Sequence, residues 1–403
     1  MIKAASIAYA IFMALITALV CYGFVLVFSV NTQIEDHYEL RSDLLRQRFS
    51  AQALAKAHFN ELSQMTTEFI VDPSKGIKVQ LSKQPWGFLD LVKTEVFNTQ
   101  ESFSQQYLMG WSKAVNDPIF YVRNNDEPLK ISGTTSLVGT IYSSAVNIKK
   151  ITVNGQTSQK AKHLGAKRVA KKVMPSYQLP EEFVPQNWQE GFLESLDDKM
   201  LIQDFTEPTM IFKVTNLLED ITLKGNIVVR STDTLTIKKT ALLEDIIVLA
   251  PKVVFEAGFK GSLQVIAGAH IETEDNVQLD YPSVLVVSGT NDQLNSIKIG
   301  AQCTIAGAVI LTGNGLAFEQ QQELVVQKDS KIDGLLYCDG VLELYGDVQG
   351  TVISSALLYK TSSTRYSNLL KDVSLSELPK PELFFGIELP ELGSGAPLIV
   401  KKV

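Results

Sequence analysis

From Ile221 to about Leu358 the chain is a succession of short apolar runs separated by turn residues, and this pattern constrains the fold more than any other feature. Each run has the length of a strand, and no amphipathic stretch of helix length separates two of them. A sheet built from βαβ units needs a helix between its parallel strands, so that class is excluded. The sequence therefore predicts a mainly β domain.

The runs repeat at the spacing that one coil of a β-solenoid requires, roughly 20 residues. We expect the corresponding strand positions to be Ile237, Phe255, Val277, Ile299, Val326 and Leu344. The prediction is a parallel β-helix over residues 216–358, with glycine at corners that need positive φ. A β-sandwich is the alternative, because its strands follow at comparable spacing; the lack of clear two-residue Asn-Gly hairpins favours the β-helix. The side chains predicted to point inward are Ile299, Ile305, Val309, Leu336, Leu344 and Val352.

The N-terminal segment is predicted to be a membrane anchor. No charged side chain occurs from Ala4 to Val30, and a helix of that length exceeds the ~30 Å hydrocarbon core of a bilayer. A cleaved signal peptide is the alternative, but its apolar region covers only about 7–15 residues. We therefore predict a single transmembrane helix over residues 1–30. The numbers of basic groups on its two sides are nearly equal, so charge alone does not decide the orientation of the helix in the membrane.

Beyond the anchor we predict a helical stalk over residues 31–72. Its apolar residues are mixed with charged ones, and Asp72-Pro73 ends the pattern. The stalk either packs on the protein's own next domain or forms a seam for partner helices. The apolar residues of this segment are Ile34, Tyr38, Leu45, Phe49, Phe59, Leu62 and Met65.

Two partial resemblances follow from these residues. The apolar helix with an amphipathic continuation and a β-rich head resembles type IV pilin-like and minor-pilin subunits, which implies assembly through the helix. It also implies a bacterial inner-membrane protein whose C-terminal domain lies outside the cytoplasm. The stretch KIDGLLYCDGVLELYGDVQGTVIS, from Lys331 to Ser354, is similar to the coil repeat of bactofilins. Those polymer-forming β-helix proteins are cytoplasmic, so the two resemblances differ on the side of the membrane.

The remaining segments are expected to be a mixed connector over 73–116, a first β block over 117–155, a basic and proline-rich insertion over 156–215, and a C-terminal cap or tail over 359–403. The insertion is either a solvated loop or a contact for an anionic surface. No aromatic residue is interleaved among its cations and the net charge of the chain is −7, so no specific nucleic-acid binding is predicted. The cations are Lys160, Lys162, Lys167, Arg168, Lys171 and Lys172.

Motifs that carry chemistry are lacking. The four histidines are dispersed, and Cys21, Cys303 and Cys338 give neither a disulfide framework nor zinc-ligand spacing. Four carboxylates close in sequence, with Lys331 as the nearest base, are the candidates for an acidic cluster of a carbohydrate-active β-helix. Spaced charges on the outside of a solenoid are also what solubility requires. We predict no catalytic, cofactor-binding or metal-binding residue. The four carboxylates are Asp333, Asp339, Glu343 and Asp347.

The sequence thus predicts a non-enzymatic, membrane-anchored structural or assembly protein of the cell envelope. Its expected partners are the lipid bilayer and either further copies or other proteins, bound through the helical stalk. The alternatives are a module that binds polysaccharide or another anionic ligand, and a carbohydrate-active β-helix enzyme.

Overall fold

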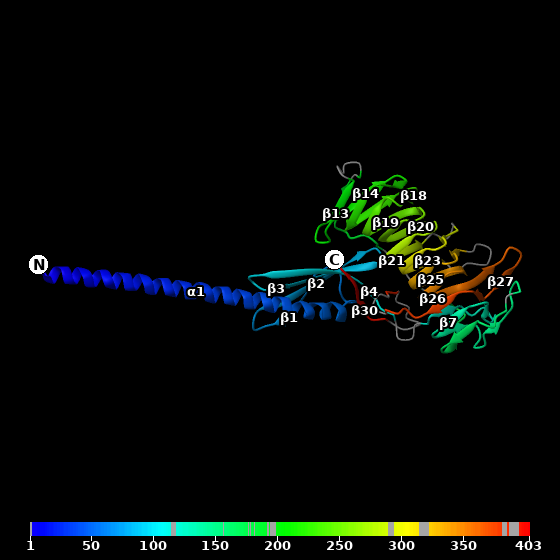
Figure 1. Cartoon of the computed structure of the whole chain (residues 1–403), viewed down its shortest axis with the longest axis horizontal. Coiled ribbons are helices and arrows are strands. Elements are labelled where there is room, and N and C mark those ends of the chain that lie inside the picture. Colours follow the sequence, from blue (N-terminus) through cyan, green and yellow to red (C-terminus); the bar gives the residue numbers. More distant parts are fainter. Residues whose placement is uncertain are drawn as a thin grey trace. The chain divides into compact units, whose positions relative to one another are not determined.

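The computed structural model describes residues 2–113, 118–155, 157–175, 177, 179–180, 182–191, 193, 199–288, 294–313, 322–380, 385–386 and 395–403. The chain forms two compact units, one of Met1–Ser82 with Lys93–Gln105 and the other of Lys83–Val92 with Gln106–Val403. It is mainly β with one long apolar N-terminal helix (Figure 1), and the sequence predicted both features correctly.

Helix α1 (Ile2–Ala57) has an exposed apolar first half and a second half that buries Leu44, Ala51 and Ala55. The packing of the second half confirms that it lies against its own unit. The helix is shorter than predicted, because it ends at Ala57 and not near Val71. His58 O accepts from Leu62 N at 3.0 Å in the turn that follows. The residues after this turn include Thr66, Thr67, Ile70 and Val71, whose branched β-carbons favour a strand.

An antiparallel sheet replaces the helical or mixed connector predicted over residues 73–116. It comprises β1 (Thr67–Asp72), β2 (Ile77–Trp86), β3 (Leu89–Phe97), β4 (Ser102–Trp111) and the C-terminal β30 (Pro397–Lys402), in that order. Buried Ile77, Val79 and Leu81 alternate with less buried neighbours, the period of two that marks a strand. Asp72-Pro73, predicted to end a helix, instead begins the β1–β2 turn, where Asp72 Oδ1 accepts from Ser74 N at 3.0 Å.

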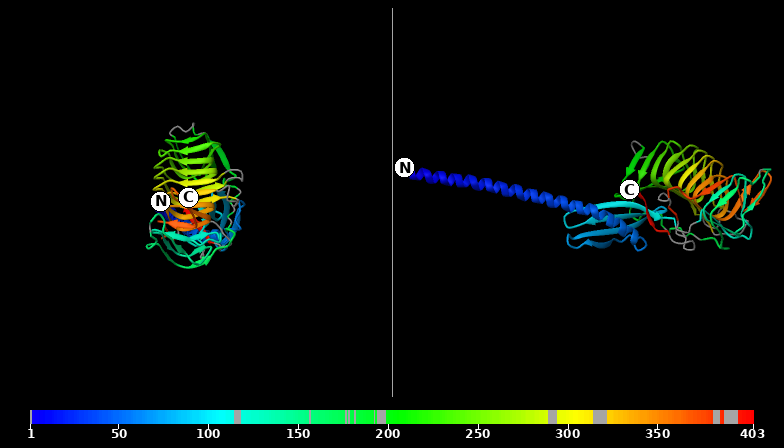
Figure 2. Two further views of the ribbon diagram at one scale, coloured as in Figure 1. Left: turned by 90° about the vertical axis from the view of Figure 1, so that its right-hand side faces the viewer. Right: turned by 60° about the horizontal axis from the view of Figure 1, so that its bottom comes forward.

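The strands of the second unit between β4 and β30 close around one apolar core (Figures 1 and 2), and they pair in parallel except where Arg365–Ser367 runs antiparallel to Leu358–Lys360. The parallel pairing rules out the antiparallel β-sandwich. The strands are β5 (Phe120–Val122), β6 (Lys130–Ser132), β7 (Ser136–Val138), β8 (Ile141–Ser143), β9 (Lys149–Lys150), β10 (Lys162–Leu164), β11 (Lys167–Val169), β12 (Trp188–Gly191), β13 (Met200–Gln203), β14 (Thr209–Val214), β15 (Leu217–Leu218), β16 (Thr222–Gly225), β17 (Ile227–Ser231), β18 (Thr234–Ile237), β19 (Leu242–Phe255), β20 (Lys260–Thr273), β21 (Gln278–Ser288), β22 (Ser296–Ile299), β23 (Thr304–Thr312), β24 (Glu323–Val326), β25 (Lys331–Leu344), β26 (Asp347–Lys360), β27 (Arg365–Ser367), β28 (Leu369–Lys371) and β29 (Ser374–Ser376).

Strands from successive turns of the chain stack side by side, and we call each of the three resulting stacks a column. The longest strands contribute residues to all three columns. Strand β19 pairs with β16, β17 and β18 on one side and with β20 on the other. Each turn of the chain lies on the one before, so that Val309 stands opposite Leu336 and Leu336 opposite Val352. The six side chains predicted to point inward all lie in the core, at most 1% exposed, which confirms those assignments: Ile299, Ile305, Val309, Leu336, Leu344 and Val352.

The predicted series of aligned positions contains one error. Ile237 stands opposite Phe255, and Ile299 opposite Val326, as expected. The residue between Phe255 and Ile299 is Thr273, however, and not Val277. Thr273 is 2% exposed, and its hydroxyl accepts from Gly300 N at 3.0 Å. A threonine satisfied in this way occupies a core position that a search for apolar residues overlooks.

Strands outside residues 216–358 extend the same sheet, in an order that differs from the sequence. Strand β26 pairs in parallel with β5 and β29, which lead on to β8 and β7, and these to β11 and β10. The first β block, the basic segment and the start of the predicted tail are therefore parts of one arrangement. The prediction of 156–215 as an insertion is wrong for this reason, as is the boundary of the predicted repeat at 216 and 358.

The proline-rich segment, residues 170–187, joins β11 at one end of the columns to β12 at the other. Its described residues lie on an outer apolar face of the sheet, where Met174 belongs to the same cluster as Tyr337. Tyr337 Oη donates to Pro175 O at 3.0 Å, and Gly87 N donates to Phe183 O at 2.7 Å. We call residues 170–187 the strap. Its prolines suit an extended segment that runs across a sheet without adding to its hydrogen-bonded ladder.

Candidate functional site

The four candidate carboxylates do not form one cluster. Asp339 accepts from Ser355 Oγ at 2.7 Å, and the exposed Asp347 accepts from Ser374 N at 2.6 Å. Asp333 is paired with Lys331 at 2.9 Å, and Glu343 is buried beside Lys360. Among the described residues, no group of three or more His, Cys, Asp and Glu side chains is placed to hold a metal ion.

Glu343 instead belongs to a cluster that the sequence did not indicate. It lies next to Glu323 of β24, Lys360 of β26 ion-pairs with both carboxylates, and Tyr345 Oη donates to Glu343 at 3.0 Å. Burial and the neighbouring Glu323 raise the pKa of Glu343, while the hydrogen bond from Glu343 lowers the pKa of Glu323. Glu343 is therefore the weaker acid of the two. This cluster joins strands β24, β25 and β26. Glu343 is only 4% exposed, so the cluster offers little access to a substrate.

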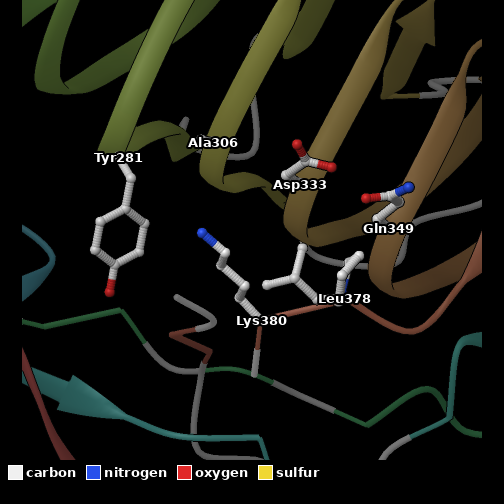
Figure 3. A pocket seen from close by; sticks show the side chains of 7 residues that line it. Tyr281, Ala306, Asp333, Gln349, Leu378 and Lys380 are labelled. Atoms are coloured by element: carbon white, nitrogen blue, oxygen red, sulfur yellow. The ribbon is translucent and has the colours of Figure 1, made fainter. Parts of the chain in front are cut away.

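One pocket of the described residues lies on the outer face of the parallel sheet. Its volume is about 220 Å³, and Asp333 is the only one of the four candidate carboxylates in its wall. The wall residues on the sheet come from β21, β23, β25 and β26, and a short stretch after β29 closes the other side (Figure 3). The lining residues are Tyr281, Ala306, Asp333, Gln349, Leu378, Pro379 and Lys380.

Two polar atoms of the pocket residues, the Tyr281 hydroxyl and Asp333 Oδ1, are buried without a hydrogen-bond partner in the described part of the chain. The other carboxylate oxygen of Asp333 accepts from Lys331 Nζ at 2.9 Å. Burial raises the pKa of Tyr281, so its phenol stays protonated at neutral pH. The residues that line the pocket thus include a neutral hydroxyl, a carboxylate oxygen without a described partner and an amide. Sequence reasoning selected Asp333 but missed Tyr281 and Gln349, which lie on other turns.

The basic segment forms the last turn of the columns. Strands β10 and β11 pair on one side only, with β7 and β8, and their lysines and arginine are exposed. Arg168 donates to Tyr142 Oη at 3.0 Å and lies over its ring, so the fold supplies an aromatic residue that the local sequence lacks. Lys172 pairs with Asp126 at 3.0 Å. The end of the columns is therefore an open, positively charged strand edge.

The cysteines differ sharply in exposure. Cys303 and Cys338 are buried in the apolar core, and burial raises the pKa of both thiols. Cys21 is exposed in the apolar half of α1. No protein-family model, curated protein or solved structure matches this chain.

Proposed function

We propose that this chain is a non-enzymatic, membrane-anchored assembly protein of the bacterial envelope. In this proposal α1 is retained in the inner membrane and the β domain lies outside the cytoplasm. The observation that carries the proposal is the division of α1 into two halves. The first is apolar and exposed along its length, and the second is packed into a folded unit.

The first half of α1 has the length and composition to cross a membrane. Its side chains are bare in the structure, with Ile7 61%, Phe12 60% and Phe28 70% exposed. Such a continuous apolar surface must be shielded from water, and the hydrocarbon core of a bilayer shields a helix of this length. A signal sequence has the same local appearance, and the alternatives differ in whether the segment stays on the mature protein.

The second half of α1 supports a pilin-like arrangement. It is held to the hairpin turns of its own unit by Lys75, which ion-pairs with Glu39 and Asp43, and by His37 with Glu101 at 3.1 Å. Of the residues expected to meet a partner helix, Phe59 and Leu62 are buried in the molecule, so that part of the prediction is wrong. The exposed stripe consists of Ile34, Tyr38, Leu45 and Phe49.

These four residues lie within one narrow stripe, because their spacing of four, seven and four residues returns to the same side of a helix. The stripe continues the apolar anchor beyond the membrane surface. We infer that it packs against the corresponding stripe of a second copy. The copies would then be held in parallel by their anchors.

We also propose that the parallel columns form a β-helix of the bactofilin type, with a second assembly surface at its ends. Strands β12, β13 and β15 begin the three columns, and β11, β10 and β9 end them. Each end is a strand edge that pairs on one side only. The backbone hydrogen-bonding groups of one end match those of the other end, as they do between two successive turns. An unpaired strand edge readily adds another strand.

The exposed residue Cys21 provides a direct test of helix assembly. We would oxidise membranes that contain the full chain and look for a disulfide-linked dimer, with Cys21→Ser as the blank. Phe49→Asp should reduce the dimer severalfold, whereas Gln33→Asp, on another side of α1, should leave it unchanged. A chain that stays monomeric in its membranes, with or without Phe49→Asp, would refute this assembly.

Retention of the anchor is tested separately by washing the membranes at alkaline pH. The full-length chain should stay in the membrane pellet, and a C-terminal tag should be accessible to protease in spheroplasts. A shortened chain in the soluble fraction would show that the apolar segment is a signal sequence. A protected tag would place the β domain in the cytoplasm.

A further inference from the structure

We propose that the pocket on the outer face of β21, β23, β25 and β26 binds one acidic sugar unit, a ring with several hydroxyls and a single carboxylate. The proposal is independent of the assembly function, since β21, β23, β25 and β26 are not end strands of the columns and the pocket uses no residue of the exposed stripe.

The sheet side of the pocket is a ladder of residues on successive turns. Ala306 stands opposite Asp333, and Asp333 opposite Gln349, so neighbouring rungs are about 4.8 Å apart. An irregular register between Leu279 and Ser283 sets Tyr281 apart from the ladder on the preceding turn. The small Ala306 side chain between the larger ones creates the space for a ligand.

Unpartnered polar atoms indicate what the ligand must provide. The buried Tyr281 hydroxyl and Asp333 Oδ1 have no partner among the described residues, and buried polar groups in folded proteins are almost always hydrogen-bonded. A carboxylate oxygen accepts only, a phenol both donates and accepts, and the Gln349 amide does both as well. A ligand with several hydroxyls satisfies all three.

Charge in the pocket favours an anionic ligand. Lys331 lies 2.9 Å from Asp333 and balances its charge. Lys380 extends from the facing segment toward the sheet, between Tyr281 and Asp333 (Figure 3), and no described residue forms an ion pair with it. Its ammonium is therefore available for a carboxylate. Leu378 and Pro379 supply an apolar wall for the CH groups of a sugar ring.

The size of the pocket agrees with a single ring. Sites for drug-sized molecules have volumes of roughly 300–1,000 Å³, and this pocket has about 220 Å³. One unit of a longer acidic glycan would fit, with the rest of the glycan outside.

The test is a titration of the full chain in detergent with D-glucuronate and, in parallel, with D-glucose. Glucuronate should bind at least tenfold more tightly than glucose. Tyr281→Phe and Lys380→Gln should each weaken glucuronate binding about tenfold, a loss of about 1.4 kcal/mol. Ala306→Leu fills the space and should abolish binding. Asp347→Asn, an exposed change at the start of β26, is the matched control and should bind as the unaltered chain does.

Melting curves of each variant verify that it is folded, and Lys380→Gln, on an exposed residue, keeps the test valid if a core-facing change unfolds the chain. Equal affinity for glucose and glucuronate would overturn the assignment of an acidic ligand. Absence of binding up to about 10 mM glucuronate, weaker than ordinary millimolar affinities, would overturn the site itself. Binding that survives Ala306→Leu in a folded chain would place the ligand elsewhere and overturn it equally.

Discussion

Individual residues at the corners of the columns permit one turn to lie on the next. Gly307, Gly334 and Gly350 occupy successive turns with φ of 144°, 141° and 142°. A β-carbon on Gly334 would lie 1.9 Å from Gly307 O. These positions therefore require glycine for both conformation and space. A different set of corners uses Asp220, Asn276 and Asp329 at φ of 50–62°, a region that asparagine and aspartate tolerate.

Gly334→Ala should consequently destabilise the chain strongly, by about 3 kcal/mol or more, because strained backbone and steric overlap add. Gly76→Ala is the matched control, since Gly76 also has positive φ (64°) but no atom within 4 Å of the added carbon. It should cost only about 1 kcal/mol. Thermal melting followed by circular dichroism measures both. Equal losses would mean that space at Gly334 does not matter.

Asp245 shows how burial can outweigh an ion pair. Its carboxylate lies 2.6 Å from Lys401 Nζ, yet its pKa is raised, and burial is the largest cause. For an acid with a raised folded-state pKa, the associated stability is present below the unfolded pKa of about 3.9 and is lost as pH rises through the folded value. The ion pair with Lys401 therefore does not make this carboxylate a net source of stability at neutral pH.

Asp245→Asn removes the titrating group and keeps a side chain that tolerates the positive φ of 55°. The melting temperature of the unaltered chain, relative to this variant, should fall between pH 4 and pH 7. Melting at matched ionic strength across that range measures the difference. A difference that grows with pH would show that the Lys401 ion pair dominates.

Among the elements, the strap depends on a few polar contacts with the sheet beneath it. Tyr337 Oη donates to Pro175 O and accepts from Tyr177 N at 3.3 Å. Tyr337→Phe removes the hydroxyl and leaves one buried and one partly buried backbone group without this partner, at a cost of about 1–3 kcal/mol. The strap should also become more sensitive to protease. Tyr38→Phe, on a side chain 70% exposed, is the control and should change neither property. Unaltered proteolysis in Tyr337→Phe would show that apolar contacts alone hold the strap.

At the scale of the whole molecule, the two ends of the columns differ in charge. The final turn carries the basic residues of β10 and β11, whereas the first turns expose acidic residues. Opposite charges favour contact between the end of one copy and the start of the next. The exposed acidic residues of the first turns are Glu190, Asp204, Glu207, Glu219 and Asp220.

The double change Lys162→Glu with Lys167→Glu should therefore weaken association between copies at low salt, with little effect on melting because both side chains are exposed. Analytical ultracentrifugation of detergent-solubilised chains at two salt concentrations measures it. Lys252→Glu with Lys260→Glu, at two exposed residues on β19 and β20 and so away from the end strands, provides a control of equal charge. The same association in all three chains would exclude the end contact.

Local patterns in the sequence determined the apolar helix, the mainly β class and the inward side chains, because each depends on the period of a short segment. Local patterns did not predict the features that depend on contacts between segments far apart in the sequence. The strands of residues 73–116 were missed, and Thr273 was overlooked at a core position. Only the tertiary structure decided that strands β5, β7, β8, β10 and β11 stack beyond β26, and that Tyr281, Asp333 and Lys380 share a pocket. Parallel strands find their partners on other turns of the chain, and no period within one segment records which turn that will be.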